Sequence, residues 1–376
     1  MTTSFWLARD TAAPRPRPQP LDGDASADVA IVGGGIAGVA CAAALARAGA
    51  AVLLLERADL ASGASGRNAG FVLGGVADSY VAACRRYGSA PATRVFEITF
   101  ADRALVRAAI DDAGIECEAR WDGSDQQAGD DAEWDEIVTS ARQLAAQGVA
   151  VEIDAIARRA TYAADGCLDP VRFVRGLAAA AADRGARIHT DTPVTEVGPQ
   201  VVRTARGRVT AAQVVLCTGA YTAHLAAARI RPVRGQMLAT APIAPGRFPR
   251  PTYAHRGYRY WRQAEDGSVL VGGWRDRATL AEVGEDDGTS PVIQDALDGW
   301  LREEGIAAPV THRWGGTMDF SHDGLPYIGR RADGLFVCGG FTGHGNGFAL
   351  AAAEILAALI GTGNHPDADL FDPERA

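Results

Sequence analysis

The chain has 376 residues, of which 47% are hydrophobic and 22% charged, a composition typical of a globular protein long enough for two domains. Acidic residues outnumber basic ones by 46 to 37, and the net charge of −9 argues against a nucleic acid partner. The sequence contains no lysine, which excludes mechanisms that need a Schiff-base lysine. Its six cysteines are widely spaced, without a Cys/His cluster, and predict reduced thiols and no metal site.

Residues 1–26 contain four prolines, from Pro14 to Pro20, that alternate with Arg and Gln and predict an extended N-terminal arm. The N-terminus has no signal-peptide pattern, so we expect a cytoplasmic protein. Residues 29–46 carry no charge, but three consecutive glycines from Gly33 interrupt this stretch. We therefore expect no membrane span.

A β-α-β unit follows the arm. Residues 29–32 predict a buried strand, residues 36–48 a helix of small side chains, and residues 51–55 a second buried strand. The turn between the first strand and the helix reads G-x-G-x-x-G, and Glu56 ends the second strand. This arrangement predicts a dinucleotide site, with the pyrophosphate at the helix N-terminus and Glu56 on a ribose. The turn alone leaves FAD and NAD open.

The remaining chain predicts two further groups of elements. A helix over residues 171–183 and strands at 187–190, 194–197, 201–204, 208–210 and 213–217 continue the first domain. A strand at 335–338 and a helix at 348–360 return to it, whereas residues 231–317 are mostly strand-like. Residues 258–263 and 268–271 form an expected antiparallel hairpin around Asp266-Gly267.

The predicted fold is therefore α/β, with a discontinuous Rossmann-like dinucleotide-binding domain, assigned below as FAD-binding, and an inserted antiparallel-sheet substrate domain. We assign residues 27–85, 168–225 and 320–365 to the first domain, and residues 86–167 and 226–319 to the second.

Two glycine-rich blocks favour FAD. Residues 63–70 read Gly-Ala-Ser-Gly-Arg-Asn-Ala-Gly and offer several hydrogen-bond donors after the second strand, and residues 339–348 read Gly-Gly-Phe-Thr-Gly-His-Gly-Asn-Gly-Phe before the last helix. With the dinucleotide turn and residues 214–220, they make the chain resemble the D-amino-acid-oxidase-like FAD oxidoreductases, which include glycine, sarcosine and γ-glutamylputrescine oxidases. The block Trp-Gly-Gly-x-x-Asp at 314–319 is most similar to the γ-glutamylputrescine oxidase branch.

The resemblance implies noncovalent FAD, because residues 314–319 contain no cysteine where the sarcosine-oxidase-like branch carries one. A helix N-terminus beside the flavin would also stabilise negative charge on it. The implied cofactor-binding residues are Gly33, Gly34, Gly35, Ile36, Ala37, Gly38, Glu56, Arg57, Ser65, Gly66, Arg67, Asn68, Ala69, Gly70, Val194, Thr218, Gly219, Gly340, Gly343, His344, Gly345, Asn346, Gly347 and Phe348.

The resemblance also informs the substrate site. Met318 and Gly347 stand where amino-acid-oxidising relatives carry an Arg and a Lys that bind carboxylates, which favours an amine substrate. Asp319 would attract an ammonium group, or else only pairs with an arginine or caps a turn. Tyr260 on the hairpin and His344 are, with Met318 and Asp319, the candidate catalytic residues, although core packing explains a hairpin tyrosine equally well. Arg234 or a hairpin arginine would restore carboxylate recognition.

The expected activity is FAD-dependent oxidation of a C–N bond, with hydride transfer to flavin and hydrolysis of the imine, and with oxygen or another electron acceptor. Alternatives are an amino-acid oxidase or dehydrogenase and a 2-hydroxy-acid dehydrogenase on the same fold. Two further alternatives belong to other functional classes: a single-Rossmann NAD-dependent dehydrogenase and a non-catalytic flavin-binding subunit.

Overall fold

The computed structural model describes residues 2–10 and 17–375, and within them two large β-sheets organise the chain. The first sheet has the core order β17-β18-β11-β1-β2-β8, with β10 and β9 attached through β11. Its strands are β1 (Ala25–Val32), β2 (Val52–Leu55), β8 (Arg187–His189), β9 (Val194–Gly198), β10 (Val201–Thr204), β11 (Gly207–Leu216), β17 (Tyr327–Arg330) and β18 (Phe336–Gly339).

The centre of this sheet is parallel and buried. β1 pairs in parallel with β11 and β2, β2 pairs with β8, and β18 pairs with β11. All four residues of β2 are buried, as expected for a strand covered on both faces. The helices packed beside it are α2 (Ile36–Arg47), α6 (Pro170–Asp183) and α8 (Ala349–Thr362).

The second sheet has the order β16-β12-β15-β14-β13-β4-β6-β5. Its strands are β4 (Ser124–Gln127), β5 (Val151–Asp154), β6 (Arg159–Tyr162), β12 (Arg231–Thr240), β13 (Thr252–Ala254), β14 (Arg259–Gln263), β15 (Val269–Gly273) and β16 (Val310–Phe320). The predicted hairpin is present as β14 and β15. One pair, β13 with β4, is parallel, so this sheet is mixed and not purely antiparallel as expected.

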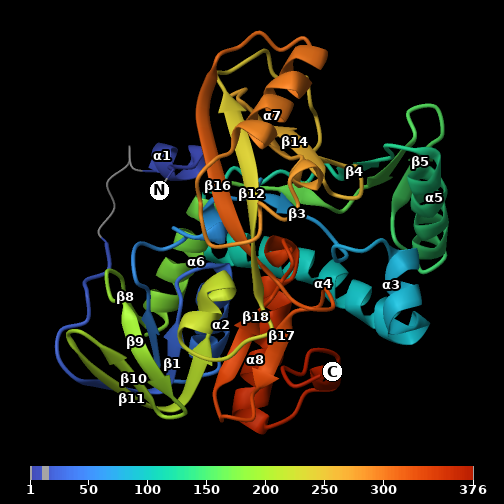
Figure 1. Cartoon of the computed structure of the whole chain (residues 1–376). Helices are drawn as coiled ribbons and strands as arrows, with labels where there is room; N and C mark the ends of the chain where they lie inside the picture. Colours follow the sequence, from blue (N-terminus) through green and yellow to red (C-terminus); the bar gives the residue numbers. More distant parts are fainter. Residues whose placement is uncertain (1, 11–16, 376) are drawn as a thin grey trace.

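Helices surround both sheets (Figure 1). The remaining long helices are α3 (Tyr80–Tyr87), α4 (Ser89–Ala113), α5 (Asp131–Ala145) and α7 (Pro291–Glu303). In Figure 1, α7 lies beside β14 at the upper end of the molecule, while α4 crosses the middle toward α3 and α5. The smaller elements are α1 (Phe5–Asp10), β3 (Phe71–Val72), β7 (Gly166–Cys167), η1 (Ala64–Gly66), η2 (Gly219–His224), η3 (Arg275–Arg277), η4 (Gly345–Gly347) and η5 (Ala368–Leu370).

The fold-class prediction is confirmed, since three separated segments build the first sheet and the intervening segments build the second. The domain boundaries expected from the sequence stay a prediction. Among the described residues, no helix is both long and apolar enough to cross a membrane.

Two local expectations are wrong. Residues 5–10 of the expected extended arm form helix α1, because Trp6 is fully buried and its indole Nε1 donates to the carbonyl of Asn68 at 2.8 Å. Pro14 lies outside the described residues. The two strands expected at 208–210 and 213–217 are one strand, β11, because almost its whole length pairs with β1.

Candidate active site

A cavity of about 950 Å³ opens between the two sheets and is lined from both. The ends of β1, β2 and β11 contribute one part, and β12, β14 and β16 contribute another. This volume is at the upper end of what small-molecule and cofactor sites occupy. The ends of the parallel strands therefore meet a space large enough for a dinucleotide.

The glycine turn lies at the wall of this cavity. Gly33 has φ of +113°, and a Cβ there would lie 2.4 Å from the carbonyl oxygen of Cys217. A Cβ on Gly38 would lie 1.9 Å from the carbonyl oxygen of Gly33, so α2 packs against the turn as the sequence predicts. Gly35 is the N-cap of α2 and has no side-chain cap, which leaves the helix N-terminus facing the cavity.

Ser65 supports the turn from the next loop. Its Oγ accepts a hydrogen bond from the Ile36 backbone N–H at 2.9 Å, and a Cβ on Gly35 would lie 2.9 Å from the same oxygen. The first two blocks that the sequence singled out are therefore in direct contact.

Glu56 lies at the end of β2 and lines the cavity. Its carboxylate accepts the N–H of Gly34 at 2.6 Å and the N–H of Ala58 at 2.9 Å, and burial raises its pKa. Arg57 stacks over the ring of Tyr221, with its guanidinium carbon 4.1 Å from the ring centre. Glu56 therefore holds the glycine turn in place while it faces the cavity. The contact between Arg57 and Tyr221 joins residues far apart in the chain, and no local pattern predicts it.

The Ser65–Gly70 block is tied to the C-terminal loop. Asn68 Oδ1 accepts from the Gly70 N–H at 2.7 Å and from Asn346 Nδ2 at 3.0 Å. Arg67 is buried, donates to the carbonyl of Gly315 at 3.1 Å, and lies 3.5 Å from Asp287. Its guanidinium is thus engaged by the protein.

The C-terminal loop approaches β3 very closely. A Cβ on Gly347 would lie 2.0 Å from the carbonyl oxygen of Leu73, so this backbone has no space for the lysine that some relatives carry here. The N–H groups of Gly347 and Phe348 donate at 3.3 Å to the carbonyls of His344 and Gly345. These two amides, expected to point at the flavin, are instead engaged within the loop.

The predicted cofactor residues divide into two sets by their positions. Those that line the cavity are Gly33, Gly35, Ile36, Ala37, Glu56, Arg57, Ser65, Arg67, Asn68, Ala69, Val194, Thr218, Gly219, Gly343, His344, Gly345, Asn346 and Gly347. Those that lie behind its wall are Gly34, Gly38, Gly66, Gly70, Gly340 and Phe348. The second set shapes the backbone; Gly70 and Gly340, for example, have φ of +73° and +81°.

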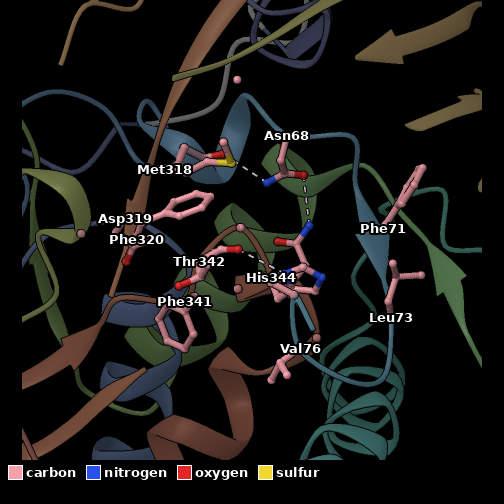
Figure 2. A pocket seen from close by; sticks show the side chains of 18 of the residues that line it. Asn68, Phe71, Leu73, Val76, Met318, Asp319, Phe320, Phe341, Thr342 and His344 are labelled. Carbon is pink, nitrogen blue, oxygen red and sulfur yellow. Dashed lines mark hydrogen bonds between the residues drawn. The ribbon is translucent and has the colours of Figure 1, made fainter. Parts of the chain in front are cut away.

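Met318 and Asp319 are adjacent on β16 and point in different directions (Figure 2). Asp319 accepts the N–H of Gly340 at 2.6 Å, and burial raises its pKa to about 6. Met318 instead lies beside Gly235 and Gly343. Of the two roles expected for Asp319, the geometry favours the turn cap over the attraction of an ammonium group.

Aromatic side chains surround the space that Met318 faces. Tyr260 stacks with Tyr253 at 6.4 Å between ring centres and meets Phe71 edge-on at the same distance. His344 meets Tyr253 edge-on at 5.9 Å, and its burial lowers the pKa of the imidazole. Figure 2 shows Phe71, Met318 and His344 around this space. We call Phe71, Tyr253, Tyr260, His344 and Met318 the aromatic cage.

Arg234 does not face the cavity, so its expected role in carboxylate recognition is wrong. It is buried and donates to Glu282 at 2.7 and 2.9 Å and to Asp286 at 2.6 Å. The hairpin residue Arg262 is also fully buried and donates to the carbonyl of Leu168 at 2.9 Å. Neither arginine lines the cavity, so neither is placed to bind a substrate there.

The residues present fit FAD. The turn at Gly33 and Gly35 places the N-terminus of α2 on the cavity, where Ser65 Oγ accepts its first N–H and added side chains would collide with protein atoms. Glu56 stands at the ribose position of the motif. The aromatic cage gives the other end of the cavity an apolar surface suited to a flavin ring and a substrate. The individual contacts to the cofactor stay a prediction.

Comparison with known proteins gives a consistent result. Residues 28–359 match the family model described as FAD dependent oxidoreductase. Gamma-glutamylputrescine oxidoreductase of Escherichia coli (strain K12) is 27% identical over 380 residues, which cover 92% of this chain and 85% of that protein. A glycine oxidase of Pseudomonas aeruginosa is 28% identical over 375 residues, with 92% and 96% covered.

Solved structures agree on the fold. The structure of glycine oxidase from Geobacillus kaustophilus superposes with a TM-score of 0.79 at 22% identity and covers 94% of this chain and 99% of that one. L-proline dehydrogenase from P. horikoshii gives the same TM-score at 20% identity, with 94% and 98% covered.

Proposed function

Because the chain belongs to the family of FAD dependent oxidoreductases, we propose that it oxidises a C–N bond of an amine in the aromatic cage and releases an imine that water hydrolyses. The expected family, the FAD cofactor and the enzyme class are confirmed by the family match. The observation that carries the choice of substrate is the cage itself, which brings Tyr260, His344 and Met318 together in the cavity that also contains the glycine turn.

When bound, FAD supplies the acceptor for the hydride that leaves the carbon beside the nitrogen. Residues of the glycine turn, Glu56 and the loops at Ser65 and Gly343 would hold it. The cage orients the substrate and excludes water. Burial lowers the pKa of His344 and raises that of Tyr260, so both rings are neutral near pH 7.

A neutral, buried surface also favours the neutral form of the amine, because burial penalises the ammonium charge. The amine therefore loses its proton to solvent as it binds, and no dedicated base is needed. Asp319 acts on the loop and not on the substrate, since its carboxylate holds the N–H of Gly340.

We further propose that the electrons come from the substrate and pass to oxygen or to another acceptor. The absence of lysine from the sequence excludes a lysine that activates oxygen beside the flavin. Anaerobic reduction followed by separate addition of oxygen and of a quinone distinguishes the two acceptors.

The test of the proposed function is anaerobic reduction of the bound flavin by a panel of primary amines, N-methyl amines, D- and L-amino acids and 2-hydroxy acids. Loss of the visible flavin absorbance with amines or amino acids supports C–N oxidation. Loss with 2-hydroxy acids alone would move the reaction to a C–O bond on the same fold.

A further inference from the structure

Arg275 lines the cavity beside the aromatic cage and is not part of any motif in the sequence analysis. It begins the short helix η3 directly after β15 and is half-buried. Its guanidinium carbon lies 5.0 Å from the ring centre of Tyr258 and 5.1 Å from that of Phe320. Two aromatic faces thus hold a cation at the wall of the cavity.

This cation has no acidic partner among residues 2–10 and 17–375. The adjacent Asp276 lies 3.5 Å from Arg259 instead. Three other arginines of the cavity wall are paired: Arg86 with Asp78 at 3.0 Å, Arg256 with Asp130 at 3.1 Å and, as shown above, Arg67 with Asp287. The remaining two, Arg57 and Arg231, are exposed to solvent, so Arg275 differs from them by its burial. Most arginines in this protein form an ion pair with Asp or Glu. A half-buried guanidinium without such a partner can bind the carboxylate of a ligand.

The conformation of the backbone before Arg275 is held by the packing and hydrogen bonding of Trp274. Trp274 has φ of +56°, a left-handed conformation that costs energy for a bulky residue. Its side chain is buried, and its N–H donates to the carbonyl of Tyr258 at 2.6 Å. Packing of Trp274 on one side therefore directs Arg275 to the other side, toward the cavity.

We propose that Arg275 binds a carboxylate of the substrate, so that the amine oxidised in the cage belongs to a carboxylate-bearing molecule. This inference rests on the proposed function, from which it takes the position of the amine. A guanidinium presents a planar pair of N–H groups that matches a carboxylate. Arg275, on helix η3, would take the place of the carboxylate-binding residues that are missing at Met318 and Gly347.

The carboxylate can stand beside the amine or at the far end of the substrate. Two amines separate these cases: N-methylglycine and 4-(methylamino)butanoate, each compared with its uncharged amide. The Kd of each compound for flavin reduction is measured by anaerobic rapid mixing. A lower Kd for N-methylglycine would place the carboxylate beside the amine, and a lower Kd for 4-(methylamino)butanoate would place it at the far end.

The deciding variant is Arg275→Gln, with Arg277→Gln as the matched control, because Arg277 is exposed on the same short helix and does not line this cavity. We expect Arg275→Gln to raise the Kd of the preferred carboxylate substrate at least tenfold and to leave that of its amide within twofold. Arg275→Lys, which keeps the charge but not the planar fork, should give an intermediate loss. The control should change neither value.

An equal loss for the carboxylate and the amide, or no loss for either, would overturn the role of Arg275 without touching C–N oxidation. If no amine reduces the flavin, the proposed function fails, and carboxylate binding is still measurable as the rise in melting temperature with butyrate. That rise should be present in wild type and in Arg277→Gln, and absent in Arg275→Gln. If glutamine impairs folding, Arg275→Lys replaces it, and the rise should then be reduced. Its presence in all variants would contradict the inference.

Discussion

Replacing Gly35 by valine tests the cofactor site without straining the backbone. Gly35 has φ of −78°, which every residue adopts readily, so the consequences come from the space that the side chain fills. Its Cβ would lie 2.9 Å from Ser65 Oγ and would displace that hydroxyl from the Ile36 N–H. The two methyl groups would then lie at the N-terminus of α2, where a pyrophosphate needs the backbone amides.

The expected magnitude follows in two steps. Loss of the hydrogen bond between Ile36 and Ser65 costs about 1 kcal/mol of the free energy of unfolding, because this bond exists without FAD, and an alanine at position 35 should show about that much. Valine should cost at least about 3 kcal/mol, more than a hundredfold in Kd, because charge-assisted contacts to the phosphates are also lost.

The assay is the ratio of flavin to protein after desalting, followed by fluorescence titration with FAD. Gly361→Val is the matched control, because Gly361 lies near the end of α8 and a Cβ there meets nothing within 4 Å. Wild-type FAD affinity in Gly35→Val would refute the assignment of this turn to the pyrophosphate.

Three further predictions concern stability. Burial raises the pKa of Asp102 to about 7, so the stability that the protonated carboxyl contributes to the native state is lost as the pH rises from about 4 through 7. In urea denaturation, Asp102→Asn should therefore gain stability relative to wild type between pH 5 and pH 8. A difference that does not change with pH would be inconsistent with this reasoning. Arg234→Gln should lower the free energy of unfolding by about 3 kcal/mol, because the buried Glu282 would lose its counter-ion and keep only hydrogen bonds such as those from Gln236 and Ser290. The Kd of carboxylate substrates in flavin reduction should stay unchanged, and a selective loss of carboxylate binding would restore the role first expected for Arg234. Trp6→Phe should cost about 1 kcal/mol in thermal or chemical unfolding through the lost hydrogen bond to Asn68, and an unchanged stability would show that α1 contributes little.

The parts of the fold that the sequence predicts well are those with local signals. The strand, glycine turn and helix from Ala25 to Arg47 follow from hydrophobic runs and from glycines whose Cβ atoms would collide with nearby backbone. Helix α6 likewise begins as expected, since Asp169 accepts the N–H groups of Val171 and Arg172 at its N-terminus.

The errors arise where distant segments decide the outcome. The sequence suggests Arg234 as a carboxylate ligand, but its guanidinium is hydrogen-bonded to Glu282, which lies 48 residues further along the chain. Helix α1 forms because Trp6 packs under a loop 62 residues away, which no local pattern reveals. Arg275 shows the converse: the role proposed for it depends on the absence of an acidic partner among the described residues, because the adjacent Asp276 pairs with Arg259, and a sequence does not display that.

Oxidation of a C–N bond by bound FAD can be measured in a single anaerobic turnover with a matched pair of substrates. The pair is an N-methyl amino acid that reduces the flavin and the hydroxy acid with oxygen in place of the nitrogen. We expect the amine to abolish the visible flavin absorbance and to yield one equivalent of carbonyl product per flavin, while the hydroxy acid changes nothing. Reduction by the hydroxy acid with no carbonyl product from the amine would contradict oxidation of a C–N bond.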